Sequence, residues 1–288
     1  MEFLSLLQAS TAALWATVGL LGLCVGSFLN VVIHRLPLMM EAQWRGDCAE
    51  LEGRDAPKAE PLNLFKPPSR CPSCGAGIRA VHNVPVVGWL ALRGKCAACA
   101  APISARYPFV ELLGGLLAVL LAWRFGYSAQ LVAALAFGWA LLALTFIDLD
   151  TQLLPDDITL PLLWAGLLVN TFAVFTDLRS AVFGAAGGYL ILWSVYWGFR
   201  LLAKKEGMGY GDFKLLAAIG AWTGWQVLPF VIVVSATLGA AIGAAVLWLS
   251  RRGMDARIPF GPYLALGGIA ALLWGREAVT FWLGRFPG

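Results

Sequence analysis

Charged side chains are scarce in this chain of 288 residues. Asp, Glu, Lys and Arg make up 13% of it, about half the share in an average soluble domain. Hydrophobic residues make up 59%, and the mean hydropathy is +0.74. A soluble core of this size cannot enclose so much apolar surface, and the lack of charge excludes a disordered chain. The net charge of +4 does not indicate a nucleic-acid-binding protein. The composition predicts an all-α polytopic membrane protein.

Histidine is also scarce, since only His34 and His82 are present. There is no H-E-x-x-H motif, so an intramembrane zinc protease would lack its ligands. There is no G-x-S-G motif, and neither histidine lies near a plausible serine nucleophile. Paired aspartates remain as the best catalytic groups that the chain offers.

Apolar stretches long enough to cross a bilayer recur along the chain. A span needs about 20 residues, with a range of roughly 17–25. We predict about eight, approximately at Leu14–Ile33, Tyr107–Trp123, Ala129–Ile147, Ile158–Phe175, Ala181–Phe199, Phe213–Trp225, Val227–Leu249 and Gly261–Trp274. The chain then divides into a first transmembrane helix (1–34), a hydrophilic loop (35–106) and a seven-helix membrane domain (107–288).

The basic residues indicate an orientation. With both termini outside, 17 of the 21 Lys and Arg fall in inner loops. Because cytoplasmic loops carry the excess of basic residues, this predicts periplasmic termini and a cytoplasmic 35–106 loop.

The cytoplasmic loop carries two C-x-x-C pairs, Cys71/Cys74 and Cys96/Cys99, separated by 21 residues. This spacing is typical of a structural site in which four thiolates hold one Zn²⁺. A pair of disulfides or a redox C-x-x-C is the alternative, but disulfides do not persist on the cytoplasmic side. We expect one zinc ion to staple this loop. Cys24 and Cys48 are expected to be ordinary thiols.

Two places bring carboxylates to the ends of predicted spans. Asp148 directly follows the third span, and Asp212 follows the Gly209-Tyr-Gly211 turn that opens the sixth. Ionisable residues in such positions are costly and are functional candidates. Two carboxylates held close share a proton, so one can act as a base on water and the other as an acid. Gly209 and Gly211 would let a substrate backbone approach Asp212. Asp212 could instead be only a helix N-cap.

Asp156 and Asp157 open the fourth predicted span. Acidic residues are favoured in the first turn of a helix, so we expect capping or structural roles for both.

Several motifs in order resemble the type IV prepilin peptidases, the bifunctional leader peptidase/N-methyltransferases of bacterial inner membranes. The resemblance covers nearly the whole chain. Besides the cysteine pairs, its motifs are Gly26-Ser-Phe-Leu-Asn30-Val-Val-Ile-His-Arg35-Leu-Pro37, Pro102-Ile-Ser-Ala-Arg106-Tyr-Pro108-Phe-Val-Glu111-Leu-Leu, Ile147-Asp148-x₆-Pro155-Asp156 and Gly209-Tyr-Gly211-Asp212-Phe-Lys214-Leu.

The resemblance implies that Asp148 and Asp212 are the catalytic pair. Family members cut a short, positively charged leader from prepilins or pseudopilins on the cytoplasmic side. They then methylate the new N-terminus with S-adenosylmethionine. No G-x-G-x-x-G motif is present, so the usual donor-binding signature is absent. Glu111, Asn30 and Arg35 are the candidates for the methyltransferase half, and a boundary carboxylate paired with Arg106 is the alternative for Glu111.

Two other functions remain open from the residues. Interfacial aspartates also serve proton relays, so a transporter or a non-enzymatic assembly scaffold is one alternative. A peptidase with a G-x-G-D motif that does not methylate is the other.

Overall fold

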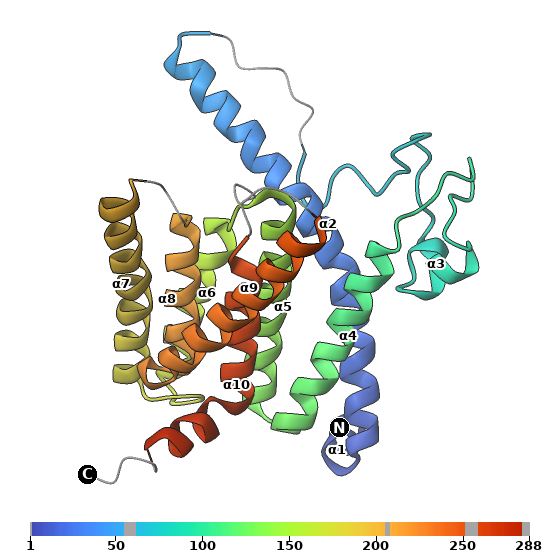
Figure 1. The fold of residues 1–288 in the computed structure, drawn as a ribbon. Coiled ribbons are helices and arrows are strands. Elements are labelled where there is room, and N and C mark those ends of the chain that lie inside the picture. The colour runs from blue at the N-terminus through green and yellow to red at the C-terminus, as the bar shows by residue number, and fades with distance from the viewer. Residues whose placement is uncertain (1, 55–61, 205–207, 251–258, 284–288) are drawn as a thin grey trace. The chain divides into compact units, whose positions relative to one another are not determined.

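The computed structural model describes residues 2–54, 62–204, 208–250 and 259–283. These residues form ten α-helices and two short 3-10 helices, with two isolated β-bridges and no strand (Figure 1). The α-helices are α1 (Glu2–Ala9), α2 (Thr11–Leu51), α3 (Val87–Ala91), α4 (Arg106–Phe125), α5 (Ala129–Thr151), α6 (Asp156–Asn170), α7 (Leu178–Ala203), α8 (Tyr210–Thr223), α9 (Leu228–Ser250) and α10 (Gly261–Leu283). The 3-10 helices are Ala80–Asn83 and Trp225–Val227. The all-α prediction is confirmed.

Six helices are long and apolar enough to cross a membrane, namely α2, α4, α5, α7, α9 and α10. They match six of the eight predicted spans, and the chain is a multi-pass membrane protein. The other two spans correspond to α6 and α8, which have 15 and 14 residues. At about 1.5 Å per residue these helices are about 21–23 Å long, shorter than a hydrocarbon core of about 30 Å. The prediction of about eight spans is therefore not confirmed.

The short helix α8 is apolar because it is enclosed by protein. From Asp212 to Thr223 every side chain except that of Lys214 is buried. Gly224 ends the helix with φ +88°, a conformation that glycine adopts without strain. The Asn170 amide donates to the carbonyl oxygens of Ala221 and Trp222 at 2.8 and 3.0 Å. These bonds satisfy the end of α8 inside the bundle, where water is scarce.

The chain divides into two compact units, Met1–Leu131 and Val132–Gly288. In the first unit α2 packs along α4 (Figure 1). The helices approach closely because glycines face one another: a Cβ on Gly22 would lie 2.6 Å from the carbonyl oxygen of Gly114. Close contact between small residues is a usual way for helices to associate in a bilayer. Beyond the predicted first span, α2 continues as helix to Leu51. The division predicted at residues 34 and 106 stays a prediction.

In the second unit α8 contacts α6, α7 and α10, and α9 packs on α10 (Figure 1). The crossing of α7 and α8 is tight, because a Cβ on Gly184 would lie 2.2 Å from the Gly220 carbonyl oxygen. Trp222, only 1% exposed, fills the centre near the far end of α8. Its ring lies 5.0 Å from that of Phe137 on α5, and its indole N–H donates to the Leu162 carbonyl on α6 at 2.8 Å. This core fixes the helices whose opposite ends carry the aspartates.

Candidate functional site

Two buried carboxylates distinguish the second unit. Asp148 is 5% exposed and Asp212 is 7% exposed. Among the residues of this unit that the structure describes, no other acidic or basic side chain is buried. The two carboxylates are also close enough to repel one another electrostatically. Because a buried charge without a partner is costly, such a pair indicates a functional centre.

The helix ends account for the placement of the pair. Asp148 lies in the last turn of α5, and Asp212 lies in the first turn of α8. The N-cap residue of α8 is Gly209, which has no side chain with which to cap the helix. Asp212 is therefore not the N-cap, which was its alternative role. A carboxylate at this position still benefits from the positive end of the helix dipole.

The two glycines before Asp212 differ in the space around them. A Cβ on Gly211 would lie 2.7 Å from the Cβ of Leu154, which is closer than side-chain atoms approach. A Cβ on Gly209 would meet Asp212 Oδ2 at 3.8 Å, an ordinary contact. Gly211 is thus required by packing, whereas Gly209 leaves room beside the carboxylate.

The other end of the Asp148 side chain is held by α10. The Gly261 N–H, the first of that helix, donates to Asp148 Oδ2 at 2.9 Å in a buried hydrogen bond. The aspartates are thereby placed by three helices that are far apart in the sequence.

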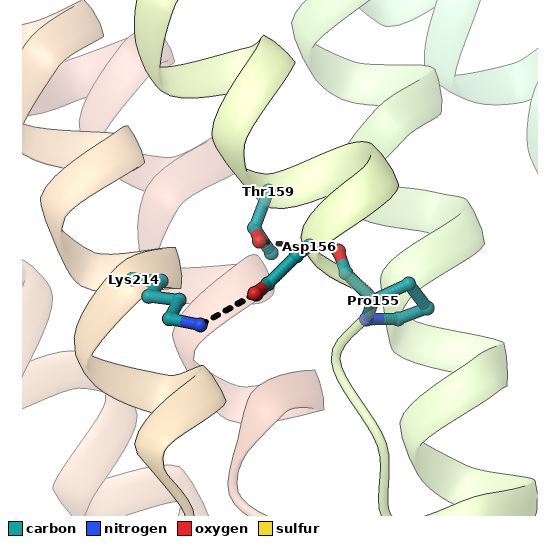
Figure 2. A network of polar contacts seen from close by, with 4 residues as sticks. All are labelled: Pro155, Asp156, Thr159 and Lys214. Carbon is teal, nitrogen blue, oxygen red and sulfur yellow. Dashed lines mark hydrogen bonds and ion pairs between the residues drawn. The ribbon is translucent and has the colours of Figure 1, made fainter. Parts of the chain in front are cut away.

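An ion pair joins α6 to α8 near the same end. Lys214 Nζ lies 2.7 Å from both carboxylate oxygens of Asp156 (Figure 2). The Asp156 side chain does not cap α6, whose N-cap residue is Pro155. The Thr159 hydroxyl instead donates to the Pro155 carbonyl at 3.1 Å, within the first turn (Figure 2). This geometry favours a structural role for Asp156.

The four loop cysteines come together in the first unit. The Sγ atoms of Cys71, Cys74, Cys96 and Cys99 all lie within 4.8 Å of one another, so the cluster could hold a metal ion. Each pair sits in a tight turn closed by a backbone hydrogen bond, from Gly75 N–H to the Cys71 carbonyl and from Ala100 N–H to the Cys96 carbonyl, both at 2.9 Å. Gly75 has φ +71° and Ala100 has φ +58°, so the two turns have the same form.

The first turn also activates its thiol. Hydrogen bonds from the backbone of Cys74 and Ser73 lower the pKa of the Cys71 thiol to about 6. The thiolate is the form that binds metal, so the turn prepares Cys71 as a ligand.

The three methyltransferase candidates each contact the chain around the cysteine module. Glu111 is 8% exposed, and its Oε2 accepts from the Val86 N–H at 2.7 Å. The Asn30 amide donates to the Tyr107 carbonyl at 3.1 Å. The Arg35 guanidinium donates to the carbonyl oxygens of Asn63 and Pro67 at 2.9 and 2.7 Å. All three therefore join α2 or α4 to neighbouring chain within the first unit.

Sequence reasoning missed three residues that shape the second unit. Gly261 donates to Asp148, Leu154 lies against Gly211 and Gly261, and Asn170 closes the end of α8. Asn170 had a sequence signal, since its side chain is the single amide inside the apolar stretch Ile158–Phe175. For Gly261 and Leu154 the signal is spatial, because Gly261 meets Asp148, and Leu154 meets Gly211 and Gly261, only after the helices have packed.

Two family models match the chain. One, described as the bacterial peptidase A24 N-terminal domain, covers residues 20–125, and the other, described as the type IV leader peptidase family, covers residues 135–244. A protein of Stutzerimonas stutzeri named prepilin leader peptidase/N-methyltransferase is 56% identical over 264 residues, covering 91% of each chain. Proteins of the same name from Aeromonas hydrophila and Pseudomonas aeruginosa are each 53% identical over 93% of both chains. No solved structure matches.

The fold is that of a multi-pass helical membrane protein. Because its relatives exceed 50% identity over nine-tenths of both chains, the chain belongs to the prepilin leader peptidase/N-methyltransferase family.

Proposed function

We propose that this chain cleaves the leader peptide from type IV prepilins or pseudopilins and then methylates the new N-terminus. The observation that carries the peptidase half is the burial of Asp148 and Asp212 at one end of the second unit. Family membership supports both activities, because the relatives carry both in their name.

The aspartates supply acid–base chemistry. One carboxylate takes a proton from water as the oxygen attacks the scissile carbonyl, while the protonated partner donates to the carbonyl oxygen. The C–N bond then breaks, and the leaving amine departs with a proton from the pair. Two like charges held close cannot both ionise, so the pair holds the single proton that this cycle needs. The room at Gly209 lets a substrate backbone lie beside Asp212.

The membrane supplies the setting. We propose an inner-membrane location with periplasmic termini, because basic residues are concentrated in the loops assigned to the cytoplasm. Asp148 and Asp212 then lie at the cytoplasmic side, where the leader of a prepilin whose own apolar segment lies in the bilayer would reach them. The proposed partners of the protein are its prepilin or pseudopilin substrates and the lipid bilayer, and no nucleic-acid partner is proposed.

One structural zinc ion fits the cysteine cluster. Four thiolates around Zn²⁺ at about 2.3 Å lie about 3.8 Å apart along each edge of the tetrahedron. The Sγ atoms of Cys71 and Cys99 lie 3.8 Å apart. When bound, zinc would link the two turns of the module and support its fold. It leaves no open position for catalysis, since four protein ligands close the site.

The methyltransferase half is assigned to the first unit. S-adenosylmethionine supplies the methyl group, and the new N-terminal amine of the pilin accepts it. Glu111, Asn30 and Arg35 are proposed to shape this region, because their side chains hold the neighbouring chain in place by hydrogen bonds. Their role is to position the region rather than to react.

Purified protein incubated with a prepilin tests both activities. We expect loss of the leader mass without S-adenosylmethionine, and loss of the leader plus a gain of one methyl group with it. Cleavage without methylation would support the peptidase-only alternative. An unchanged prepilin under both conditions would contradict the proposal and favour the transporter or scaffold alternative.

A further inference from the structure

The contact between Asp148 and the start of α10 has no role in the proposed function as described so far. Among the described residues, the hydrogen bond to the Asp148 carboxylate comes from the Gly261 N–H alone, at 2.9 Å. The two residues are 113 positions apart. Gly261 also lies outside residues 135–244, the part of the chain that the leader peptidase family model matches.

Space at Gly261 is filled by the catalytic carboxylate itself. A Cβ on Gly261 would lie 2.7 Å from Asp148 Oδ2 and 3.1 Å from Leu154 Cδ2. The first distance is shorter than real side chains tolerate, and the second requires the leucine to move. Any other residue at this position must therefore displace Asp148, Leu154 or the start of α10.

Leu154 links this contact to the second aspartate. Its Cβ faces Gly211, directly before Asp212, while its Cδ2 faces Gly261. One side chain thus sets the spacing of the turns that carry Asp212 and hold Asp148. The two contacts can be tested separately, because Leu154→Ala keeps the Cβ that faces Gly211 and removes the Cδ2 that faces Gly261.

The start of α10 is itself fixed in place. The Ser235 hydroxyl on α9 donates to the Tyr263 carbonyl at 3.0 Å. A Cβ on Gly268 would lie 3.0 Å from Ile219 on α8 and 3.2 Å from Leu141 on α5. Because α10 packs this closely on three helices, the Gly261 N–H is a pre-set donor.

We propose that Gly261 is a positioning residue of the peptidase centre, which holds the Asp148 carboxylate through its N–H and leaves it room by lacking a side chain. The inference rests on the proposed function, since it assigns Asp148 to peptide cleavage. A displacement of about 1 Å in a catalytic group costs about 100-fold in rate.

The test is the cleavage kinetics of Gly261→Ala in the full-length protein. We expect kcat to fall about 100-fold with KM within about twofold of wild type, because the substrate contacts are unchanged. Gly198→Ala is the matched control, since a Cβ there meets nothing within 4 Å. Thermal unfolding of the same samples in detergent reports whether the second unit, which carries Gly261, is folded. A wild-type kcat in Gly261→Ala would overturn the proposal.

A double mutant separates positioning from general damage. Adding Leu154→Ala gives the new methyl group space away from Asp148, so Gly261→Ala/Leu154→Ala should cleave at least about fivefold faster than Gly261→Ala. If the losses in cleavage rate caused by Gly261→Ala and by Leu154→Ala simply multiply in the double mutant, the argument that the two side chains compete for the same space fails.

A second measurement needs no Gly261 variant. The Gly261 amide should exchange its hydrogen faster in Asp148→Ala than in wild type, because the first N–H of a helix has no partner within the helix. Equal exchange would overturn the proposal. Asp148→Asn in the cleavage assay distinguishes failure of the positioning role from failure of the proposed function. Cleavage by Asp148→Asn contradicts the proposed function. A wild-type cleavage rate in Gly261→Ala, together with an inactive Asp148→Asn, contradicts the positioning role alone.

Discussion

Lys214 and Asp156 form a two-pronged ion pair, with Nζ at 2.7 Å from each carboxylate oxygen. The pair joins the first turn of α6 to the first turns of α8, two residues beyond Asp212 (Figure 2). It therefore ties the start of α6 to the helix that carries Asp212.

This ion pair predicts a modest effect of its removal. The side chains of Lys214 and Asp156 are 30% and 52% exposed, so the pair is worth less than about 1 kcal/mol. Asp156→Asn should slow prepilin cleavage by about two- to fivefold, and added salt should narrow the difference from wild type. Asp157→Asn is the matched control, because it changes the neighbouring carboxylate in the same helical turn. Equal rates for the two variants would contradict the role of the pair.

Asn170 predicts a larger effect on stability. Its amide donates to two carbonyl oxygens of α8, and its oxygen accepts from the N–H groups of Phe175 and Thr176 at 3.0 and 3.2 Å. Asn170 is 1% exposed, and Asn170→Ala would remove four hydrogen bonds, two of them to buried carbonyl oxygens of α8. We expect a loss of about 2 kcal/mol or more in the free energy of unfolding. Thermal unfolding in detergent measures it.

Thr237→Ala is the control for that measurement. Within the part of the chain that the structure describes, the exposed Thr237 hydroxyl donates to carbonyls of its own helix only, those of Val233 and Val234. Its removal should leave Tm nearly unchanged. Equal Tm values for Asn170→Ala and Thr237→Ala would show that Asn170 does not stabilise the end of α8.

The two glycines before Asp212 should respond differently to alanine. A methyl group on Gly211 collides with Leu154, so Gly211→Ala should move Asp212 and lower kcat about 10- to 100-fold. Gly209→Ala meets no such obstacle, and any loss should appear in KM, because the methyl group would narrow the approach of the substrate. Steady-state cleavage kinetics of both variants separate the two effects. An unaltered kcat in Gly211→Ala would contradict the packing argument.

Metal content tests the cysteine cluster. Cys71→Ser should lose the bound zinc, since it removes the thiol that backbone hydrogen bonds prepare as a ligand. Cys48→Ser should keep one zinc ion per chain, because Cys48 is exposed and lies outside the cluster. Elemental analysis of the purified proteins measures both. One zinc per chain in Cys71→Ser would count against the four-thiolate site.

The sequence predicted the features that depend on local pattern. Long apolar stretches identified the six helices that are long enough to span a membrane, and the spacing of the two C-x-x-C pairs predicted the clustering of the four thiols. Both patterns depend on residues that are close in the sequence, so they can be recognised without knowledge of the fold.

Packing decided what the sequence could not predict. The apolar stretch of α8 has the hydropathy of a span, but its side chains face other helices rather than lipid. Length gave a different signal from hydropathy, because the 14 residues of α8 are fewer than the about 20 that a span needs. Likewise, Asp148 and Asp212 were found as carboxylates at helix ends, whereas Gly261 and Leu154 are ordinary residues until α10 packs against α5 and α8.

Replacement of the aspartates tests the central claim most directly. Asp148→Asn and Asp212→Asn keep the size of each side chain and remove its acid–base function. We expect each to lower prepilin cleavage about 10²–10⁴-fold, while both still methylate a pre-cut pilin at the wild-type rate. The measurement is the mass of the pilin product formed by equal amounts of membrane-inserted protein. Cleavage at the wild-type rate by either variant would contradict the aspartate-pair account.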